Sequence, residues 1–411
     1  MSKKLVQHSN PGERIGPTSM RQINGALLLN LIRDRGSISR AELARVSGLT
    51  KPTVSSQVAE LVRRGVVRED GEGAPDSRGG KPSRLLRFDA KCALILGVEI
   101  GASEVRAALA DLDGVILERG SVAIHPERGA TVVLAALEKL AKELIAGAAG
   151  RKRKLLAMGV AAPGRVDSQT GVILEAGNVF HWRNVAVKKT LERSFPAQIA
   201  VENDVNLAVL GEMHEGAARG ARNFVLIRLT TGIGAGIVLG GQLYQGSHWA
   251  AGEIGHMPID HRATPDGPND RGDLELASGM DRLRERLKST LSDNAAGNRG
   301  LVQALAEAVR RNDPVATAVV EDLALHLGAA ITNLTVAIDP ELIVLDGEPF
   351  DLVIDRIQES VKRVVPWPVR IERSALGDEA VLLGAINVAR GLASEVISAG
   401  WTAGKSGKGS Q

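Results

Sequence analysis

Ahead of residue 93, apolar residues follow the three- and four-residue spacing of amphipathic helices. One helix is predicted near residues 21–35, with an apolar face that comprises Ile23, Leu27, Leu28, Leu31 and Ile32. Two shorter helices, joined by a turn at Gly48, are predicted within residues 39–64. Two strand-like runs follow, at 66–68 and 85–88, with a loop rich in Gly, Ser and Arg between them. Three helices and a hairpin in this order predict a winged helix-turn-helix.

The second of the two short helices carries a polar surface. Thr50 precedes Lys51-Pro52-Thr53 and is a predicted N-cap with proline in the first turn. In a helix-turn-helix this helix enters the major groove of double-stranded DNA. The side chains that we expect to contact DNA from it are Thr50, Lys51, Thr53, Ser55, Ser56 and Gln57.

Charge separates this segment from the rest of the chain. Residues 1–88 hold 16 Lys and Arg against 8 Asp and Glu, which leaves 35 basic and 40 acidic residues elsewhere from totals of 51 and 48. A local basic excess favours a polyanionic partner, because contacts to phosphates release counterions. Within the loop, Arg78, Lys81 and Arg84 flank flexible backbone. The loop either enters the narrow minor groove of DNA or forms a solvated hairpin tip, and the sequence leaves both open.

From residue 93 onward the apolar runs have the length of strands. Predicted strands occupy 94–100, 105–111, 115–123 and 155–161, with a helix at 131–148. A second series of strands is predicted at 199–201, 224–230, 235–239 and 341–346. Strands followed by alternating helix and strand, occurring twice, predict two α/β lobes. A ligand would then bind between the lobes.

Composition narrows the class of protein. Hydrophobic residues make up 44% of the chain but aromatic residues only 2%, so the cores must rely on Leu, Val, Ile and Ala. The single cysteine, Cys92, excludes an internal disulfide and favours a reducing compartment. No signal-like segment and no run of about 20 apolar residues is evident, which predicts a cytoplasmic protein without membrane contact. The tails at 1–17 and 399–411 are predicted to be disordered.

Four motifs of small and polar residues occur in order along the second part of the chain. They are Gly159-Val-Ala-Ala-Pro-Gly164, Glu202-Asn-Asp-Val-Asn206, Thr231-Gly-Ile-Gly-Ala-Gly236 and Ala251-Gly-Glu-Ile-Gly-His256. Together they resemble the ROK family of repressors and sugar kinases. The resemblance implies an actin-like (ribonuclease H-like) two-lobed α/β fold over residues 93–398. With the winged helix-turn-helix at 18–88 in front of this fold, the chain is similar to the family's xylose- or N-acetylglucosamine-responsive repressors.

The resemblance also implies a sugar site. Sugar hydroxyls both donate and accept hydrogen bonds, so a specific pocket needs several fixed polar side chains. The positions matching the family's sugar ligands are Asn178, Asn203, Asp204, Glu253, His256 and Glu275. Asp204 matches the base that deprotonates the reacting hydroxyl in the kinases. Taken alone, Asn203 and Asp204 could instead cap a helix, and Glu253 and His256 could form a surface pair. Trp182 is predicted to pack in the core.

Two departures from the family concern cofactors. At the first phosphate turn the kinases carry Asp followed by Gly-Gly-Thr-Lys, whereas this chain has Glu99-Ile-Gly-Ala-Ser-Glu104. The alanine adds a Cβ and Glu104 adds a negative charge beside the nucleotide, which disfavours ATP binding. The family's zinc site joins a histidine, matching His256, to three cysteines. Residues 267–275 contain no cysteine, so we predict no structural zinc.

Two functions follow from these patterns. The first is a non-catalytic regulator that binds a palindromic operator as a homodimer or higher oligomer. The resemblance implies that it acts as a repressor of carbohydrate-metabolism genes. Its effector would be a monosaccharide or sugar phosphate. The second is an ATP-dependent sugar kinase that retains Asp204 as its base and has gained a DNA-binding head.

Overall fold

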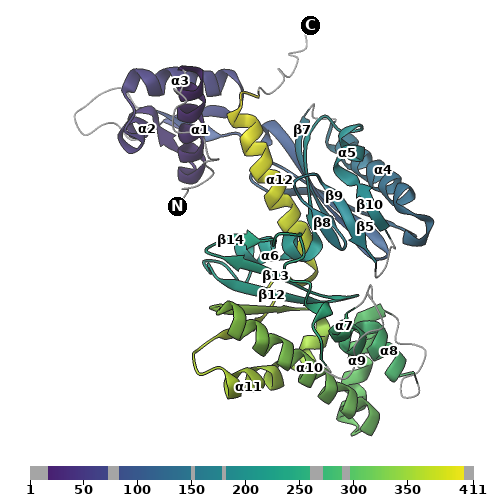
Figure 1. The fold of residues 1–411 in the computed structure, drawn as a ribbon. Coiled ribbons are helices and arrows are strands. Elements are labelled where there is room, and N and C mark those ends of the chain that lie inside the picture. Colours follow the sequence, from purple (N-terminus) through teal and green to yellow (C-terminus); the bar gives the residue numbers. More distant parts are fainter. Residues whose placement is uncertain are drawn as a thin grey trace.

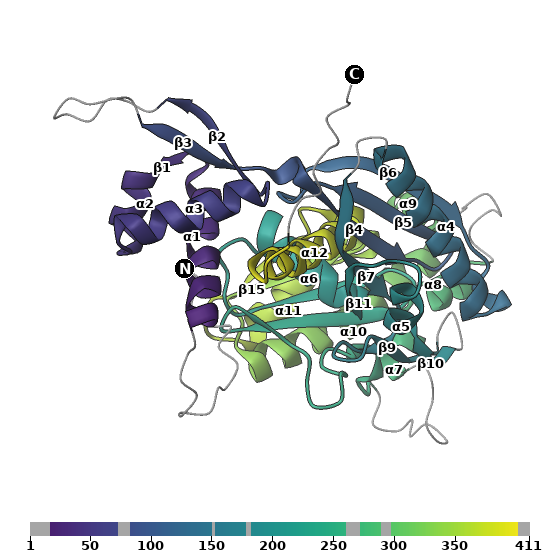
Figure 2. The same ribbon diagram turned by 90° about the horizontal axis from the view of Figure 1, so that it is seen from above.

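The computed structural model describes residues 17–72, 83–149, 153–177, 182–259, 272–288 and 297–401. The predicted disordered tails lie outside these residues, apart from Pro17 and residues 399–401. Figure 1 shows an N-terminal head beside two lobes, with the last helix running from the head to the boundary between the lobes. The same arrangement is seen from above in Figure 2.

The head is a winged helix-turn-helix, which confirms the prediction from sequence. Its elements are α1 (Pro17–Arg35), β1 (Ile38–Ser39), α2 (Arg40–Ser47), α3 (Lys51–Arg63), β2 (Val67–Glu72) and β3 (Arg84–Phe88). The strands form an antiparallel sheet in the order β1-β3-β2. At the turn between α2 and α3, Gly48 takes a φ of +70°. The Thr50 hydroxyl then accepts the backbone N–H of Thr53 at 3.4 Å, so α3 begins with the predicted cap.

The buried face of α1 differs from the predicted one. Leu28 and Ile32 are fully buried and Leu29 is nearly so, whereas Ile23 and Leu27 are exposed. The helix contacts α2, α3 and β3 of the head. The apolar periodicity therefore predicted the helix but included Ile23 and Leu27 in a packed face that these neighbours do not cover.

The first lobe is built on a five-stranded sheet. Its strands are β4 (Ala93–Ile100), β5 (Glu104–Ala110), β6 (Ile116–Ala123), β7 (Lys154–Ala162) and β11 (Gln198–Asn203), in the order β11-β7-β4-β5-β6. The helices of this lobe are α4 (Ala130–Ala149), α5 (Val187–Glu192) and α6 (Asp204–Glu215). A small sheet of β8 (Arg165–Asp167), β9 (Val172–Ala176) and β10 (Trp182–Ala186) covers one end. Trp182 is buried in this core, as predicted.

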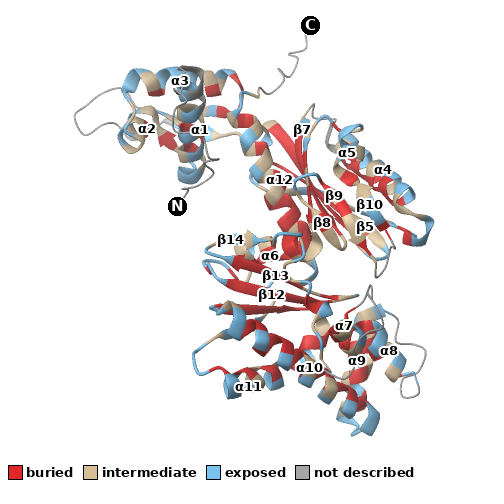
Figure 3. Ribbon diagram, in the orientation of Figure 1, coloured by how far each residue is buried: buried red, intermediate tan, exposed pale blue. Residues whose placement is uncertain are grey.

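The second lobe repeats the topology of the first. Its sheet has the order β14-β13-β12-β15-β16, from β12 (Phe224–Leu229), β13 (Ile233–Leu239), β14 (Gln242–Tyr244), β15 (Leu342–Asp346) and β16 (Arg370–Arg373). In both sheets the first strand pairs antiparallel with the second and parallel with the fourth. The helices are α7 (Asp273–Ser278), α8 (Met280–Arg286), α9 (Gly297–Arg310), α10 (Pro314–Ile338) and α11 (Ile354–Val364). Figure 3 shows the buried strands at the centre of each lobe.

One predicted boundary between the lobes is wrong. The strand at 199–201 was expected to open the second lobe, but β11 pairs in parallel with β7 and completes the first sheet. The second lobe begins at Phe224 instead. Because β11 ends at Asn203, its end and the start of α6 lie at the edge of the first lobe that faces the second.

The last helix, α12 (Ala380–Ser398), returns to the first lobe and contacts α6, β4, β7 and α1. Its crossing with α6 is close: a Cβ at Gly384 would lie 1.8 Å from the carbonyl oxygen of Leu207. Only glycine therefore fits here. Ile386 and Ile397 of this helix share one hydrophobic cluster with Leu28 and Leu86 of the head.

Two arginines of the head bind α12 and the adjoining turn. Arg64, which follows α3 and is 7% exposed, donates Nε to the carbonyl of Trp401 at 2.8 Å and Nη2 to that of Ile397. Arg33 of α1 donates to the hydroxyl of Ser394 at 2.9 Å and pairs with Asp113 at 3.1 Å. The head is thus fixed to the helix that packs on α6.

Two helical segments are longer and more apolar than the sequence analysis expected. Residues 314–338 contain a window of mean hydropathy 1.4, and residues 377–398 contain one of 1.5. Both windows are long enough to cross a membrane. Of each window, 56% is buried inside the fold. We therefore interpret both as core helices whose apolar surface is covered by protein.

Candidate functional site

A cleft of about 1010 Å³ lies between the lobes. Its walls come from the turns after β4 and β7, the start of α6, the β12–β13 turn and the segment from Trp249 to His256. Asn203, Asp204, Glu253, His256 and Glu275 all line it. The structure thus brings together five of the six positions predicted for the sugar site. The sixth, Asn178, lies outside the described residues.

The start of α6 places two of these side chains. Asn203 caps the helix, since its Oδ1 accepts the N–H of Asn206 at 3.0 Å. Its Nδ2 donates to the carbonyl of Gly164 at 2.8 Å and to Oδ1 of Asp204 at 3.1 Å. Burial raises the pKa of Asp204, and the nearby Arg228 opposes that shift. Capping and cleft-lining are therefore compatible roles for Asn203, because one amide group does both.

The opposite wall carries Glu253, His256 and Glu275. Glu253 immediately precedes the short 3-10 helix Ile254–His256, and His256 is the last residue of that helix, which lies between β14 and α7 in the chain. Burial raises the pKa of the Glu253 carboxyl group, and the nearby His256 opposes that shift. Glu275, in α7, accepts the backbone N–H of Ile233 at 3.1 Å and so fixes the β12–β13 turn. These contacts place carboxylate and imidazole groups at one end of the cleft.

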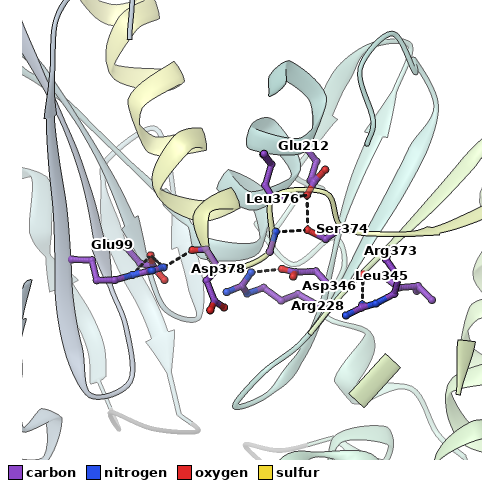
Figure 4. A network of polar contacts seen from close by, with 11 residues as sticks. Glu99, Glu212, Arg228, Leu345, Asp346, Arg373, Ser374, Leu376 and Asp378 are labelled. Carbon is purple, nitrogen blue, oxygen red and sulfur yellow. Dashed lines mark hydrogen bonds and ion pairs between the residues drawn. The ribbon is translucent and has the colours of Figure 1, made fainter. Parts of the chain in front are cut away.

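Sequence reasoning missed the charged side chains at the other end. Arg228 of β12 pairs with Asp346 at the end of β15, and both side chains are more than 90% buried. Arg106 of β5 pairs with Glu99 at 2.6 Å and also donates to the carbonyl of Asp378 at 2.6 Å (Figure 4). An arginine within the otherwise apolar run Phe224–Leu229 was the available signal for the first pair.

Trp249 was also missed. It lines the cleft and has a φ of +58°, a conformation that a bulky residue rarely adopts. The scarcity of aromatic residues in this chain could have drawn attention to it.

The candidate DNA face lies on the head. Lys51, Ser55 and Ser56 of α3 are exposed, as is the capping Thr50, while Thr53 and Gln57 are half-buried. The buried residues Val54, Val58 and Leu61 hold the opposite face of this helix in the head. The six predicted side chains therefore lie at or beside the exposed face of α3.

The predicted wing contacts are described only in part. Arg84 is 73% exposed at the start of β3 and pairs with Glu69 of β2 at 2.9 Å. This contact lowers the pKa of Glu69, against the opposing effect of burial. Arg78 and Lys81 lie outside the described residues, so their contact with the minor groove stays a prediction.

Residues 95–391 match the ROK family, and residues 27–68 match a winged helix-turn-helix DNA-binding family. The first match spans well over half of the chain. The chain belongs to the ROK family.

Among ROK relatives, a putative xylose repressor of Caldicellulosiruptor sp. (strain Rt8B.4) is 30% identical over 383 residues, which cover 89% of this chain and 95% of that protein. The DNA-binding transcriptional dual regulator NagC of Escherichia coli (strain K12) is 26% identical, covering 80% and 81%. Both relatives are named as regulators, one a repressor and the other a DNA-binding transcriptional regulator, and together with the winged helix-turn-helix of this chain they show its regulator role.

Solved ROK structures share the fold. A ROK family transcriptional regulator, described as a homologue of the E. coli MLC protein, aligns with a TM-score of 0.75 and 24% identity over 92% of this chain and 98% of its own. A ROK glucokinase from Streptomyces griseus, in complex with glucose and AMPPNP, aligns with a TM-score of 0.59 and 30% identity over 73% and 100%. The share of this chain that aligns with the glucokinase is about the size of the two-lobed body without the head.

The zinc site of the ROK family does not fit this chain. The one cysteine, Cys92, lies in the short helix Ala90–Cys92 that joins head and body, where it packs against the cluster shared with α12. Burial raises the pKa of its thiol to about 12, which makes it a poor metal ligand.

Proposed function

We propose that this chain is a sugar-responsive transcriptional repressor whose inter-lobe cleft binds a monosaccharide without phosphorylating it. One observation carries the proposal: a helix-turn-helix head is fixed through Arg33, Arg64 and a shared core to α12, and α12 packs on α6, whose first residues line the cleft. A ligand that moves the lobes would therefore act on the head through packed protein.

The described cleft residues suit a sugar. Asn203, Asp204, Glu253, His256 and Glu275 offer carboxylate, amide and imidazole groups that can each bond a hydroxyl. Trp249 offers an apolar face beside them, of the kind that packs on the C–H groups of a sugar ring. The names of relatives include a putative xylose repressor and an N-acetylglucosamine repressor, so these two sugars are the ones to test first.

The kinase alternative is supported by Asp204 and by the similarity of the body to a ROK glucokinase. Against it, Ala102 and Glu104 occupy the turn after β4, and Glu99 is engaged by Arg106 rather than free for a metal. Phosphoryl transfer depends on positioning and on neutralising phosphate charge. A coupled ATP assay over a panel of monosaccharides tests this alternative. Turnover at about 1 s⁻¹, the low end for kinases, that was abolished by Asp204→Asn would establish a kinase and refute the non-catalytic assignment.

DNA binding is tested on an operator selected from random duplexes. Fluorescence anisotropy between 50 and 200 mM salt should show a steep loss of affinity. Lys51→Ala should weaken binding and lower the salt slope by about one, because one phosphate contact is lost. The control is Lys139→Ala, an exposed lysine on α4 of the first lobe. If Lys51→Ala matched this control, α3 would not be the DNA-binding helix.

The assembly follows from the same proposal. We divide the chain into a head at 18–88 and a sugar-binding body at 93–398, and expect a cytoplasmic homodimer. Two heads on a two-fold axis would contact half-sites about 34–36 Å apart, so the operator should be palindromic. Sedimentation of the protein with its selected operator measures the stoichiometry.

A further inference from the structure

The cleft contains more acidic than basic side chains. Eight carboxylates and four arginines line its described part. Each arginine is already paired: Arg106 with Glu99 at 2.6 Å, Arg228 with Asp346, and both Arg165 and Arg183 with Glu175, at 3.7 and 2.8 Å. Among the described residues, the cleft therefore has no arginine without a carboxylate partner to offer an anionic ligand.

Arg228 is the most deeply placed of these cations. It lies directly across from Asp346 in the parallel register of β12 and β15, and its side chain is 8% exposed (Figure 4). Burial alone would lower the pKa of its guanidinium, but Asp346, Asp204 and Glu99 together raise it. Three carboxylates from both lobes thus surround one fixed positive charge. In a kinase, that region must accommodate magnesium and phosphates.

Three backbone donors at the two turns that would face a phosphate are also engaged. At the turn after β4 the N–H of Gly101 donates to the carbonyl of Glu104 at 2.9 Å. At the β12–β13 turn, the N–H of Thr230 donates to the carbonyl of Gly232 at 3.1 Å, and that of Ile233 donates to Glu275. Phosphate sites normally depend on such donors pointing at the ligand.

We propose that the cleft selects an uncharged sugar and rejects its phosphorylated form, with the Arg228–Asp346 pair setting this selectivity. The proposal rests on the sugar-binding function proposed above and names the class of effector. A phosphate on the hydroxyl that faces Asp204 would meet that carboxylate and Glu99, while the only buried cation between them is held by Asp346. Like charges brought together in a confined site repel strongly.

The test uses the full-length protein and calorimetric titration. Each monosaccharide is paired with its phosphate: xylose, glucose and N-acetylglucosamine against the corresponding 5- or 6-phosphates. Inorganic phosphate and magnesium AMPPNP serve as separate arms for a phosphate site that needs no sugar. One parent sugar should bind, and its phosphate should bind at least about tenfold more weakly. A phosphate that bound more tightly than its parent, or binding in either separate arm, would overturn the proposal and leave the sugar sensor standing.

Asp346→Asn tests the assigned pair. It removes the charge that holds Arg228 while keeping an oxygen acceptor. The tenfold difference in affinity between the parent sugar and its phosphate should therefore become smaller. The control is Asp351→Asn, an exposed aspartate that pairs with Arg373 outside the cleft. If Asp346→Asn fails to fold, Glu99→Gln, which releases Arg106, should reduce this difference in the same way. An unchanged difference in the folded variant would refute the role of the pair. Failure of every sugar and sugar phosphate to bind would refute the sugar sensor itself.

Discussion

At the scale of single residues, carboxylates in and beside the cleft lie where burial disfavours their charge. Glu202, at the end of β11, is 8% exposed. Its Oε1 accepts the N–H of Asn203 at 2.8 Å and Nδ2 of Asn206 at 3.0 Å, and its Oε2 accepts Nε2 of Gln245. Burial nevertheless raises its pKa above the ordinary 4.5, against the effect of these bonds. The side chain positions the start of α6 while its charge destabilises the fold.

Glu202→Gln should therefore stabilise the protein at pH 7.5. A raised pKa means that the wild-type contribution is favourable below about pH 4.5 and is lost as the pH rises through the pKa of the folded state. Glutamine never ionises, and a flipped Gln245 amide can accept its new N–H. Each tenfold change in proton affinity corresponds to about 1.4 kcal/mol, which sets the scale of the gain. Urea denaturation at pH 4, 5.5 and 7.5 measures it.

The surface variant Glu192→Gln is the control for that series. It should differ little from wild type at any of the three pH values. An advantage of Glu202→Gln that persisted unchanged at pH 4 would show that ionisation of Glu202 is not its cause.

At the scale of elements, α12 shows how the same residue type can have opposite effects within one helix. Gly384 lies against the carbonyl of Leu207 in α6, whereas a Cβ at Gly391 would meet no atom within 4 Å. The first glycine is required by close packing. The second only weakens the helix, because glycine has a poor helix propensity.

Gly384→Ala should lower the free energy of unfolding by about 1–3 kcal/mol, the usual cost of overpacking. Gly391→Ala should raise it by up to about 1 kcal/mol. Urea titrations of both variants measure whether each substitution raises or lowers the free energy of unfolding. If both substitutions changed it in the same direction, α6 and α12 would not be packed as closely as the structure has them.

Elements formed by local patterns could be predicted, while contacts between distant segments could not. The Thr50 cap and the strands near 94–100 and 224–230 follow from neighbouring residues, whereas the cleft position of Asp204 was implied by the resemblance to the ROK family. Arg228 and Asp346 lie 118 positions apart, and Arg64 contacts residues more than 330 positions away, so no local spacing reveals either. The strand at 199–201 was assigned to the wrong lobe because its partner is chosen by tertiary packing.

At the scale of the whole molecule, the head and the cleft are joined through α12. Arg64 ends the DNA-reading helix and holds two carbonyls at the far end of α12, and α12 packs on α6 at the cleft. Each contact in this path is buried or half-buried. Energetic coupling between a sugar and an operator therefore has a continuous physical route.

Arg64→Met should uncouple sugar binding in the cleft from operator binding by the head. The variant should still bind the sugar and the operator, but the sugar should no longer change operator affinity, a change typically of about 5–150-fold in coupled systems. Arg63→Met is the matched control, because Arg63 is exposed and pairs only locally with Glu60. Anisotropy with and without saturating sugar measures the ratio. A ratio in Arg64→Met equal to that of wild type would exclude this contact from the route.

The return of α12 to the first lobe also sets an order of events during synthesis. The head and the first sheet leave the ribosome early, yet α12, which closes both cores, is made about 180 residues after β11 completes that sheet. At about 5–20 residues per second this interval lasts roughly 10–40 s. During it the head has neither Ile397 nor Trp401 to bind. Until then the DNA-reading helix of the nascent chain lacks the contacts that fix its orientation on the body, so operator recognition by a fixed head must wait until α12 has been made.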